Sequence, residues 1–246
     1  MTNLKPNQFL LDGHIITEIP LLCQTALVQA LLEDRKTQTR RTRGLDEVNE
    51  IPVAWTYQAT LESNCQKHVF GRLNKENKVC YRESIKSPYG KPGDLLWVRE
   101  AWNKYYDEDG EYIAYKADDH CNDFKWKPSI HMPKAACRIW LMVDEIRVER
   151  LQDISEGDAV AEGVDVTPKL YSDGNAYFDY SGKIGAQGFN FNTAKESFKT
   201  LWESINGVES WNQNPWVWVV KFRTLSKTGR PSDELIVKNW KEVANG

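Results

Sequence analysis

The spacing of apolar residues changes several times along the chain, and these changes predict a mixed fold of helices and strands. Between residues 19 and 33 the apolar positions, among them Leu22, Ala26 and Ala30, recur at helical intervals, so we expect an amphipathic helix. Runs rich in β-branched and aromatic residues are typical of half-buried strands. Such runs occupy residues 95–102, 112–115, 136–150 and 216–223, the third being one long strand or two joined by a bend.

Capping signals mark the ends of further helices. Ser155 and Asp158 have capping-box spacing at the start of a short helix, and Gly163 suits its exit. Asn192 stands where it can cap a later helix, and Ser232 where it can cap a last one.

The rest of the chain gives weaker periodicity. Residues 44–90 are polar and predict an insertion with little regular structure, and residues 164–188 predict a long loop that covers a site. Because we find no internal repeat and no clean linker, we expect one domain over residues 20–225. An amino-terminal extension at 1–19 precedes it, and a tail with a short helix at 226–246 follows it.

Composition narrows the class of protein. The 246 residues suffice for a sizeable core, and no apolar run is long enough to cross a membrane. The amino terminus lacks the apolar segment of a secretion signal, so we expect a cytoplasmic protein. The five cysteines are irregularly spaced and favour reduced thiols over disulfides. Cys65, His68, Cys80 and Cys121 lack the paired spacing of a zinc ribbon or finger, so we expect no metal.

Residues 35–43 hold five cations in a chain whose formal net charge is −3. That net charge argues against a broad, nonspecific coat on DNA, which needs many phosphate contacts. A focused site for an anion is one interpretation of the block. The other is a solvated helix end, where cations complement the helix dipole.

Five segments, taken in order, carry a resemblance. Together they resemble the ASCH family of PUA-like proteins, in a branch common in bacteriophages and prophages, over roughly residues 20–225. Asp34 stands where the family usually has Gly, and Asp tolerates the left-handed backbone that a helix exit requires. The segments are residues 34–41, 91–100, 128–133, 151–163 and 214–218.

The resemblance implies an α+β, PUA-like fold: a curved β-barrel flanked by helices, with loop insertions. It also implies a function connected with RNA or modified nucleobases. Some ASCH proteins are amidohydrolases that remove the acetyl group of N4-acetylcytidine, a reaction for which we expect no metal or other cofactor here. They use a Lys and a Thr three residues apart and a Glu from a later helix, which Lys36, Thr39 and Glu162 match. Arg41 matches an Arg that follows the Thr by two.

Hydrolysis of an amide needs an activated nucleophile, a proton for the leaving amine and donors for the oxyanion. Lys36 would be the base or nucleophile, because burial and the neighbouring cations disfavour its charged form. Glu162 would move a proton or orient water, and the Thr39 hydroxyl would hold the oxyanion. The alternative is structural: Lys36 and Glu162 form an ion pair that closes the cleft, and Thr39 satisfies backbone groups.

Four further residues are candidates for binding the substrate or nucleic acid: Arg35, Arg40, Arg41 and His131. A lone His in a turn is also often structural. Besides the hydrolase, two other functions stay open. One is a module that binds a modified nucleoside or single-stranded RNA without chemistry, or a ribonuclease as in other family members. The other is a phage accessory protein whose partner is a host protein. No membrane partner is expected.

Overall fold

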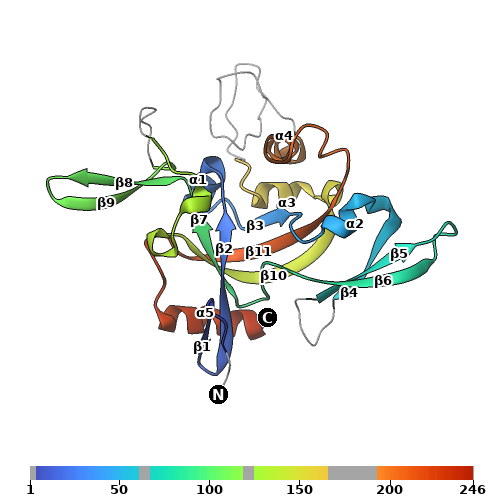
Figure 1. The fold of residues 1–246 in the computed structure, drawn as a ribbon, viewed down its shortest axis with the longest axis horizontal. Coiled ribbons are helices and arrows are strands. Elements are labelled where there is room, and N and C mark those ends of the chain that lie inside the picture. Colours follow the sequence, from blue (N-terminus) through green and yellow to red (C-terminus); the bar gives the residue numbers. More distant parts are fainter. Residues whose placement is uncertain (1–3, 61–66, 119–124, 166–192, 246) are drawn as a thin grey trace. The chain divides into compact units, whose positions relative to one another are not determined.

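The computed structural model describes residues 4–60, 67–118, 125–165 and 193–245 (Figure 1). Its fold is mixed α+β, as the apolar spacing predicted, with 40% strand. The chain forms two compact units. Unit 1 comprises Met1–Asp34, Gly93–Val143 and Phe222–Gly246, and unit 2 comprises Arg35–Pro92 and Asp144–Lys221. The division into extension, domain and tail stays a prediction.

Unit 1 is built around strands that hydrogen-bond side by side. In order they are β1 (Gln8–Leu11), β2 (His14–Leu22), β7 (Leu95–Arg99) and the first part of β10 (Trp140–Arg150). β1 and β2 form an antiparallel hairpin, β2 and β7 are parallel, and β10 is antiparallel to β7. The unit also holds α1 (Thr25–Leu32), α5 (Asp233–Asn245) and a separate ribbon of β8 (Trp102–Asp107) and β9 (Gly110–Tyr115).

The core of unit 1 joins these elements. It contains Ile16 of β2, Leu95 of β7, Trp140 of β10 and Ile236 of α5, each almost fully buried. The predicted cap of the last helix is confirmed, because the hydroxyl of Ser232 accepts a hydrogen bond from the backbone N–H of Leu235.

The helix predicted at residues 19–33 is wrong in its first part. Residues 14–22 form strand β2, and α1 begins at Thr25. The β-branched residues of this segment favour a strand, and Pro20 disfavours a helix interior because it has no N–H to donate. Asp34 lies beyond the helix with φ +60°, the left-handed conformation expected there.

Unit 2 contains the rest of β10, followed in sheet order by the first part of β11 (Trp216–Ser226) and by β3 (Gln38–Arg41). A second sheet has the order β4 (Trp55–Thr60), β5 (Lys67–Leu73) and β6 (Val79–Lys86). Helices α2 (Asp46–Glu50), α3 (Glu156–Ala161) and α4 (Ala194–Asn206) belong to this unit, and α3 packs against α4. The described strands form open sheets and close no barrel.

The prediction of little regular structure at residues 44–90 is wrong. This segment forms α2 and the three-stranded sheet, whose strands are 6, 7 and 8 residues long and whose inward positions include several aromatic rings. Phe70 packs edge-on against Trp216, with ring centroids 5.6 Å apart, and His68 against Trp218 at 4.7 Å. Polar residues such as Glu83, the register partner of Phe70, also occupy inward positions, so apolar residues alternate too irregularly for the sequence to predict these strands.

The capping box of α3 is confirmed, because the Ser155 hydroxyl accepts from the backbone N–H of Asp158 at 3.0 Å. Helix α4 is capped by Thr193, whose hydroxyl accepts from Glu196 N–H at 3.1 Å. The cap predicted at Asn192 therefore falls one residue early in the chain, and Asn192 itself lies outside the described residues. The predicted loop at 164–188 lies outside them from residue 166 onward.

Replacing Gly93 should test the packing of α5 in unit 1. Gly93 has φ +88°, and a Cβ there would lie 2.5 Å from Cδ1 and Nε1 of Trp240. We expect Gly93→Ala to lower the free energy of unfolding by about 3 kcal/mol, since it combines backbone strain with overpacking. Gly13→Ala is the control: it has φ +80° but nothing within 4 Å, so strain alone should cost about 1 kcal/mol. Equal losses in urea denaturation would contradict this packing.

His68 should make stability depend on pH. Burial lowers the pKa of His68 from 6.5 to about 4. The unfolded chain therefore binds more protons than the folded one between these values, so stability is complete above pH 6.5 and falls as pH drops towards 4. Relative to His68→Phe, the wild type should lose up to about 3 kcal/mol over this range. Denaturation midpoints that fall in parallel for both proteins would rule this out.

Candidate functional site

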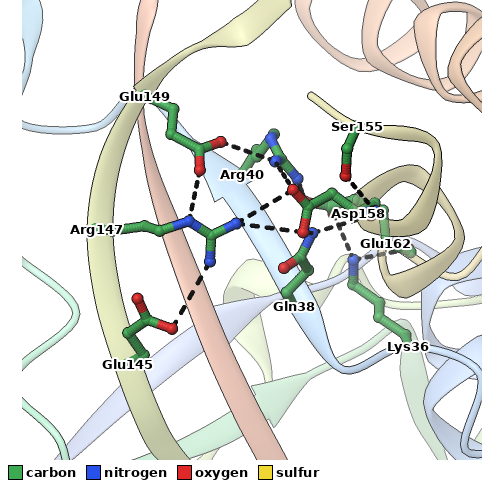
Figure 2. Close-up of polar contacts among 9 residues, drawn as sticks. All are labelled: Lys36, Gln38, Arg40, Glu145, Arg147, Glu149, Ser155, Asp158 and Glu162. Carbon is green, nitrogen blue, oxygen red and sulfur yellow. Dashed lines mark hydrogen bonds and ion pairs between the residues drawn. The ribbon is translucent and has the colours of Figure 1, made fainter. Parts of the chain in front are cut away.

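Charged side chains from three elements of unit 2 gather into one network (Figure 2). We call it the ionic cluster. Its members are Lys36, Gln38, Arg40, Glu145, Arg147, Glu149, Asp158 and Glu162, to which Ser155 is joined as the cap of α3. Lys36, Gln38 and Arg40 come from β3 and the residues just before it, while the acidic members come from β10 and α3. The cluster therefore links strand and helix segments that are more than a hundred residues apart.

Lys36 and Glu162 are the most deeply buried charged members. Lys36 Nζ donates to Glu162 Oε2 at 2.9 Å and to the Glu162 backbone carbonyl at 2.9 Å. The residues are 1% and 3% exposed. Their backbones also form an isolated β-bridge, and the N–H of Thr37 donates to the carbonyl of Ala161 at 2.9 Å. The side-chain contact is thus held in place by the backbone on both sides.

Arg40 supplies the second cation to Glu162. Its guanidinium donates to Glu162 Oε1 at 3.1 Å and to Glu149 Oε2 at 3.0 Å, and it lies 3.3 Å from Asp158 Oδ2. Each carboxylate oxygen of Glu162 is therefore paired with a different cation. The planar fork of arginine suits such multiple contacts, because its donors have fixed directions.

Asp158 connects the buried part of the cluster to its more exposed part. Burial acts to raise the pKa of Asp158, but the hydrogen bond from Gln38 and the charges of Arg40 and Arg147 outweigh it, and the pKa lies below its ordinary value. Gln38 Nε2 donates to Asp158 Oδ1 at 3.0 Å, and Arg147 donates to both carboxylate oxygens at 3.2 and 3.3 Å. Asp158 is thus held as a carboxylate.

Of the three residues predicted to be catalytic, two are in contact and the third points away from them. Lys36 and Glu162 are in direct contact. Thr39 lies on β3 between Gln38 and Arg40, both of which reach Asp158, so strand alternation directs its side chain to the opposite face. Thr39 is 2% exposed and pairs through its backbone with Val220.

The residues predicted to bind the substrate or nucleic acid do not all lie in one place. Arg40 belongs to the ionic cluster, and Arg35 donates through its guanidinium to the carbonyl of Gly163, next to Glu162. Arg41 follows Arg40 on β3, where its backbone pairs with Trp218. His131 is exposed at the end of a short 3-10 helix in unit 1.

The basic block is therefore not a solvated helix end. Residues 38–41 form β3, and Lys36 and Arg40 are almost fully buried among carboxylates. The sequence showed a concentration of cations but not their partners. Gln38 and Arg40, like Arg147 and Glu149, stand two residues apart on strands, and this spacing places each pair on one face. This two-residue spacing is the sequence signal that could have indicated the remaining members, such as Gln38, Arg147 and Glu149.

One cavity of unit 2 has a volume of about 350 Å³. Lys36, Thr39 and Glu162 are not among its lining residues, which are Thr42, Asp46, Asn49, Glu50, Trp202, Asn206, Ser210, Gln213 and Pro215. Within the described ranges, no three His, Cys, Asp or Glu side chains are grouped so as to hold a metal ion. No helix in that part of the chain is long and apolar enough to cross a membrane.

The Lys36–Glu162 contact should contribute strongly to stability. Lys36→Met removes one of the two cations that offset the buried carboxylate, so we expect a loss of about 3 kcal/mol in urea denaturation. In the Lys36→Met background, Glu162→Gln should lower the free energy of unfolding less than it does in the wild type. The coupling free energy between the two substitutions should be about 1 kcal/mol or more. Lys104→Met is the control, because Lys104 and Glu111 form an exposed pair in which each is 44% exposed. Additive losses at Lys36 and Glu162 would show that the pair is not coupled.

Comparisons with models of protein families, with curated proteins and with solved structures found no match for this chain. The contacts of Lys36, Arg40 and Glu162 are therefore the observations on which a function is proposed.

Proposed function

We propose that this protein is a hydrolase that cleaves the amide of an acylated nucleobase, with N4-acetylcytidine as the model substrate, and that it belongs to the ASCH family of PUA-like proteins. The supporting observation is the contact of Lys36 with Glu162, 2.9 Å apart in space and 126 residues apart in sequence. These are the Lys and Glu that the family resemblance matches to a catalytic pair.

The pair can exchange a proton along its hydrogen bond. Transfer from Lys36 Nζ to Glu162 Oε2 leaves a neutral amine beside a carboxylic acid. The amine then removes a proton from a water molecule, whose oxygen attacks the carbonyl carbon of the substrate. When the bond from that carbon to the exocyclic nitrogen breaks, Glu162 gives its proton to the nitrogen. The products are a carboxylic acid and the free amine of the base, and the Lys36 ammonium and Glu162 carboxylate are restored.

Arg40 acts as a positioning residue in this scheme. It holds Glu162 Oε1, which leaves Oε2 directed at Lys36, and Glu149 and Asp158 hold the guanidinium in turn. The oxyanion role that the resemblance gives to Thr39 is not supported, because strand alternation turns that side chain to the other face of β3. The Lys36 ammonium, with three donors, is the better source of a hydrogen bond to the oxyanion.

A second candidate is a binding module without chemistry. The observation that favours it is burial: the side chain of Lys36 is 0% exposed and that of Glu162 is 3% exposed, with each oxygen of Glu162 paired. Such a pair stabilises a fold without touching a ligand. For the hydrolase, the residues that cover the pair must move before a carbonyl group reaches Nζ. Activity therefore decides between the two functions.

Acetate release from N4-acetylcytidine tests the hydrolase. Lys36→Met and Glu162→Gln should each lower the rate by about 10²–10⁴-fold, because each removes a proton-transfer group. Glu145→Gln makes the same chemical change in a side chain that is 52% exposed and 3.9 Å from Arg147, and it should keep the wild-type rate. Circular dichroism spectra confirm that each variant is folded. A wild type that is inactive on a panel of N-acylated nucleosides contradicts the hydrolase and leaves the binding module.

A further inference from the structure

The sheet of β4, β5 and β6 has two faces of different character. Side chains at alternate positions point to opposite faces of a strand. His68 and Phe70 are fully buried on the inner face. The positions that alternate with them along β5, together with the register partners of those positions, form the outer face, where Lys67, Arg82 and Lys86 are exposed.

The charge of the outer face has one sign. Its three charged residues are the cations Lys67, Arg82 and Lys86, and among the described residues none of them forms an ion pair with a carboxylate. Glu83, the carboxylate of β6, is on the inner face with Phe70 as its register partner and accepts a hydrogen bond from Tyr81. The outer face is therefore more basic than a chain with a net charge of −3 would lead one to expect.

The position of two of these cations is unfavourable for folding alone. Lys67 and Lys86 are register partners on neighbouring strands. Like charges directly opposite each other on one face repel and destabilise a sheet. A bound anion that lies between two such ammonium groups would remove that repulsion. The arrangement thus favours a ligand with negative charges at close spacing.

The other residues of the outer face are neutral. The neutral outer positions include Thr56, Ala59, Val69 and Ser84. The side chains of Val79 and Gln58 cover Gly71, since a Cβ there would lie 2.9 Å from Val79 Cγ1 and 3.3 Å from Gln58 Cδ. Three strands spaced about 4.8 Å apart make a face about 10 Å across, which is wide enough for one nucleic-acid strand.

This sheet belongs to the same unit as the ionic cluster and packs against β11. His68 and Phe70 of its inner face contact Trp218 and Trp216 of β11. Trp218 is in turn the register partner of Arg41 on β3, the strand that carries Arg40. A polymer held on the outer face would therefore be held by the unit that contains Lys36 and Glu162.

We infer that the outer face of β4, β5 and β6 binds the phosphate backbone of single-stranded RNA, so that the acylated base is hydrolysed within an RNA strand rather than as a free nucleoside. The hydrolytic part of this inference rests on the proposed function, whereas the binding part does not. A single strand suits both parts, because it presents an unpaired base at the lowest cost.

Fluorescence anisotropy with an unstructured, labelled RNA of about 15 nucleotides tests the binding. The triple variant Lys67→Ser, Arg82→Ser, Lys86→Ser should bind about 30-fold more weakly at low salt, and the slope of log affinity against log salt should fall by about 2 in magnitude. The control triple variant makes the same change at the exposed Lys5, Lys116 and Lys238 and should bind within about threefold of wild type. Absence of RNA binding by the wild type, or equal affinity of both triple variants, overturns the inference. Equally tight binding of duplex DNA through the same cations overturns the assignment to single-stranded RNA.

Two more readouts separate this inference from its alternatives. The triple variant should melt at the wild-type temperature or above it, because the repulsion between Lys67 and Lys86 is gone. It should release acetate from free N4-acetylcytidine at the wild-type rate, and from acetylated RNA about tenfold more slowly at limiting substrate. If no protein releases acetate but RNA binding still depends on the three cations, the proposed hydrolase fails and the binding face stands. If acetate is released from RNA equally by both triple variants, the hydrolase stands and the binding face fails.

Discussion

A carboxylate that leaves water must have its charge offset inside the protein, and Glu162 meets this requirement with a different cation at each oxygen. Lys36 and Arg40 come from one short segment, whereas Glu162 stands at the end of α3. The contact needs both parts of the chain at once, since an unpaired charge at this depth would be far more costly than the pair. It thus fixes the position of α3 against β3.

The charges of the ionic cluster become more exposed away from that contact. The side chain of Glu162 is 3% exposed, those of Glu149 and Asp158 are 23% and 28% exposed, and that of Glu145 is 52% exposed. Water and salt screen the outer members, so their pairing adds little to stability, while the inner pair keeps nearly its full electrostatic strength. The inner residues set the geometry, and the outer ones adjust to solvent.

Sequence patterns located most elements where local signals were strong. The aromatic and β-branched run that became β11, and the Ser155 cap of α3, were both readable because each depends on neighbouring residues alone. Strand β2 was misread because the apolar residues of its last part also fit a helical spacing, whereas its pairing with β1 and β7 shows that the backbone of residues 14–22 is extended. The three-stranded sheet was missed for a related reason: its inner face is defined by tryptophans of β11 that are distant in sequence.

For the candidate site, the meeting of Lys36 with Glu162 was anticipated from a family resemblance, and no local pattern could have supplied it. The opposite orientation of Thr39 follows from β3 being a strand, whereas the sequence had suggested a helix end. The burial of the pair was equally out of reach, because it depends on how α3, β10 and β3 pack together. Long-range packing therefore determines both the orientation of Thr39 and the burial of the Lys36–Glu162 pair.

Strands β10 and β11 each change units partway along, β10 at Val143 and β11 at Lys221. No single stretch of the gene encodes either unit, so neither can be expressed as a contiguous fragment. Each unit must also wait during synthesis for its last segment, which is Phe222–Gly246 in one unit and Asp144–Lys221 in the other. On the ribosome, the two units are thus expected to become complete at nearly the same time.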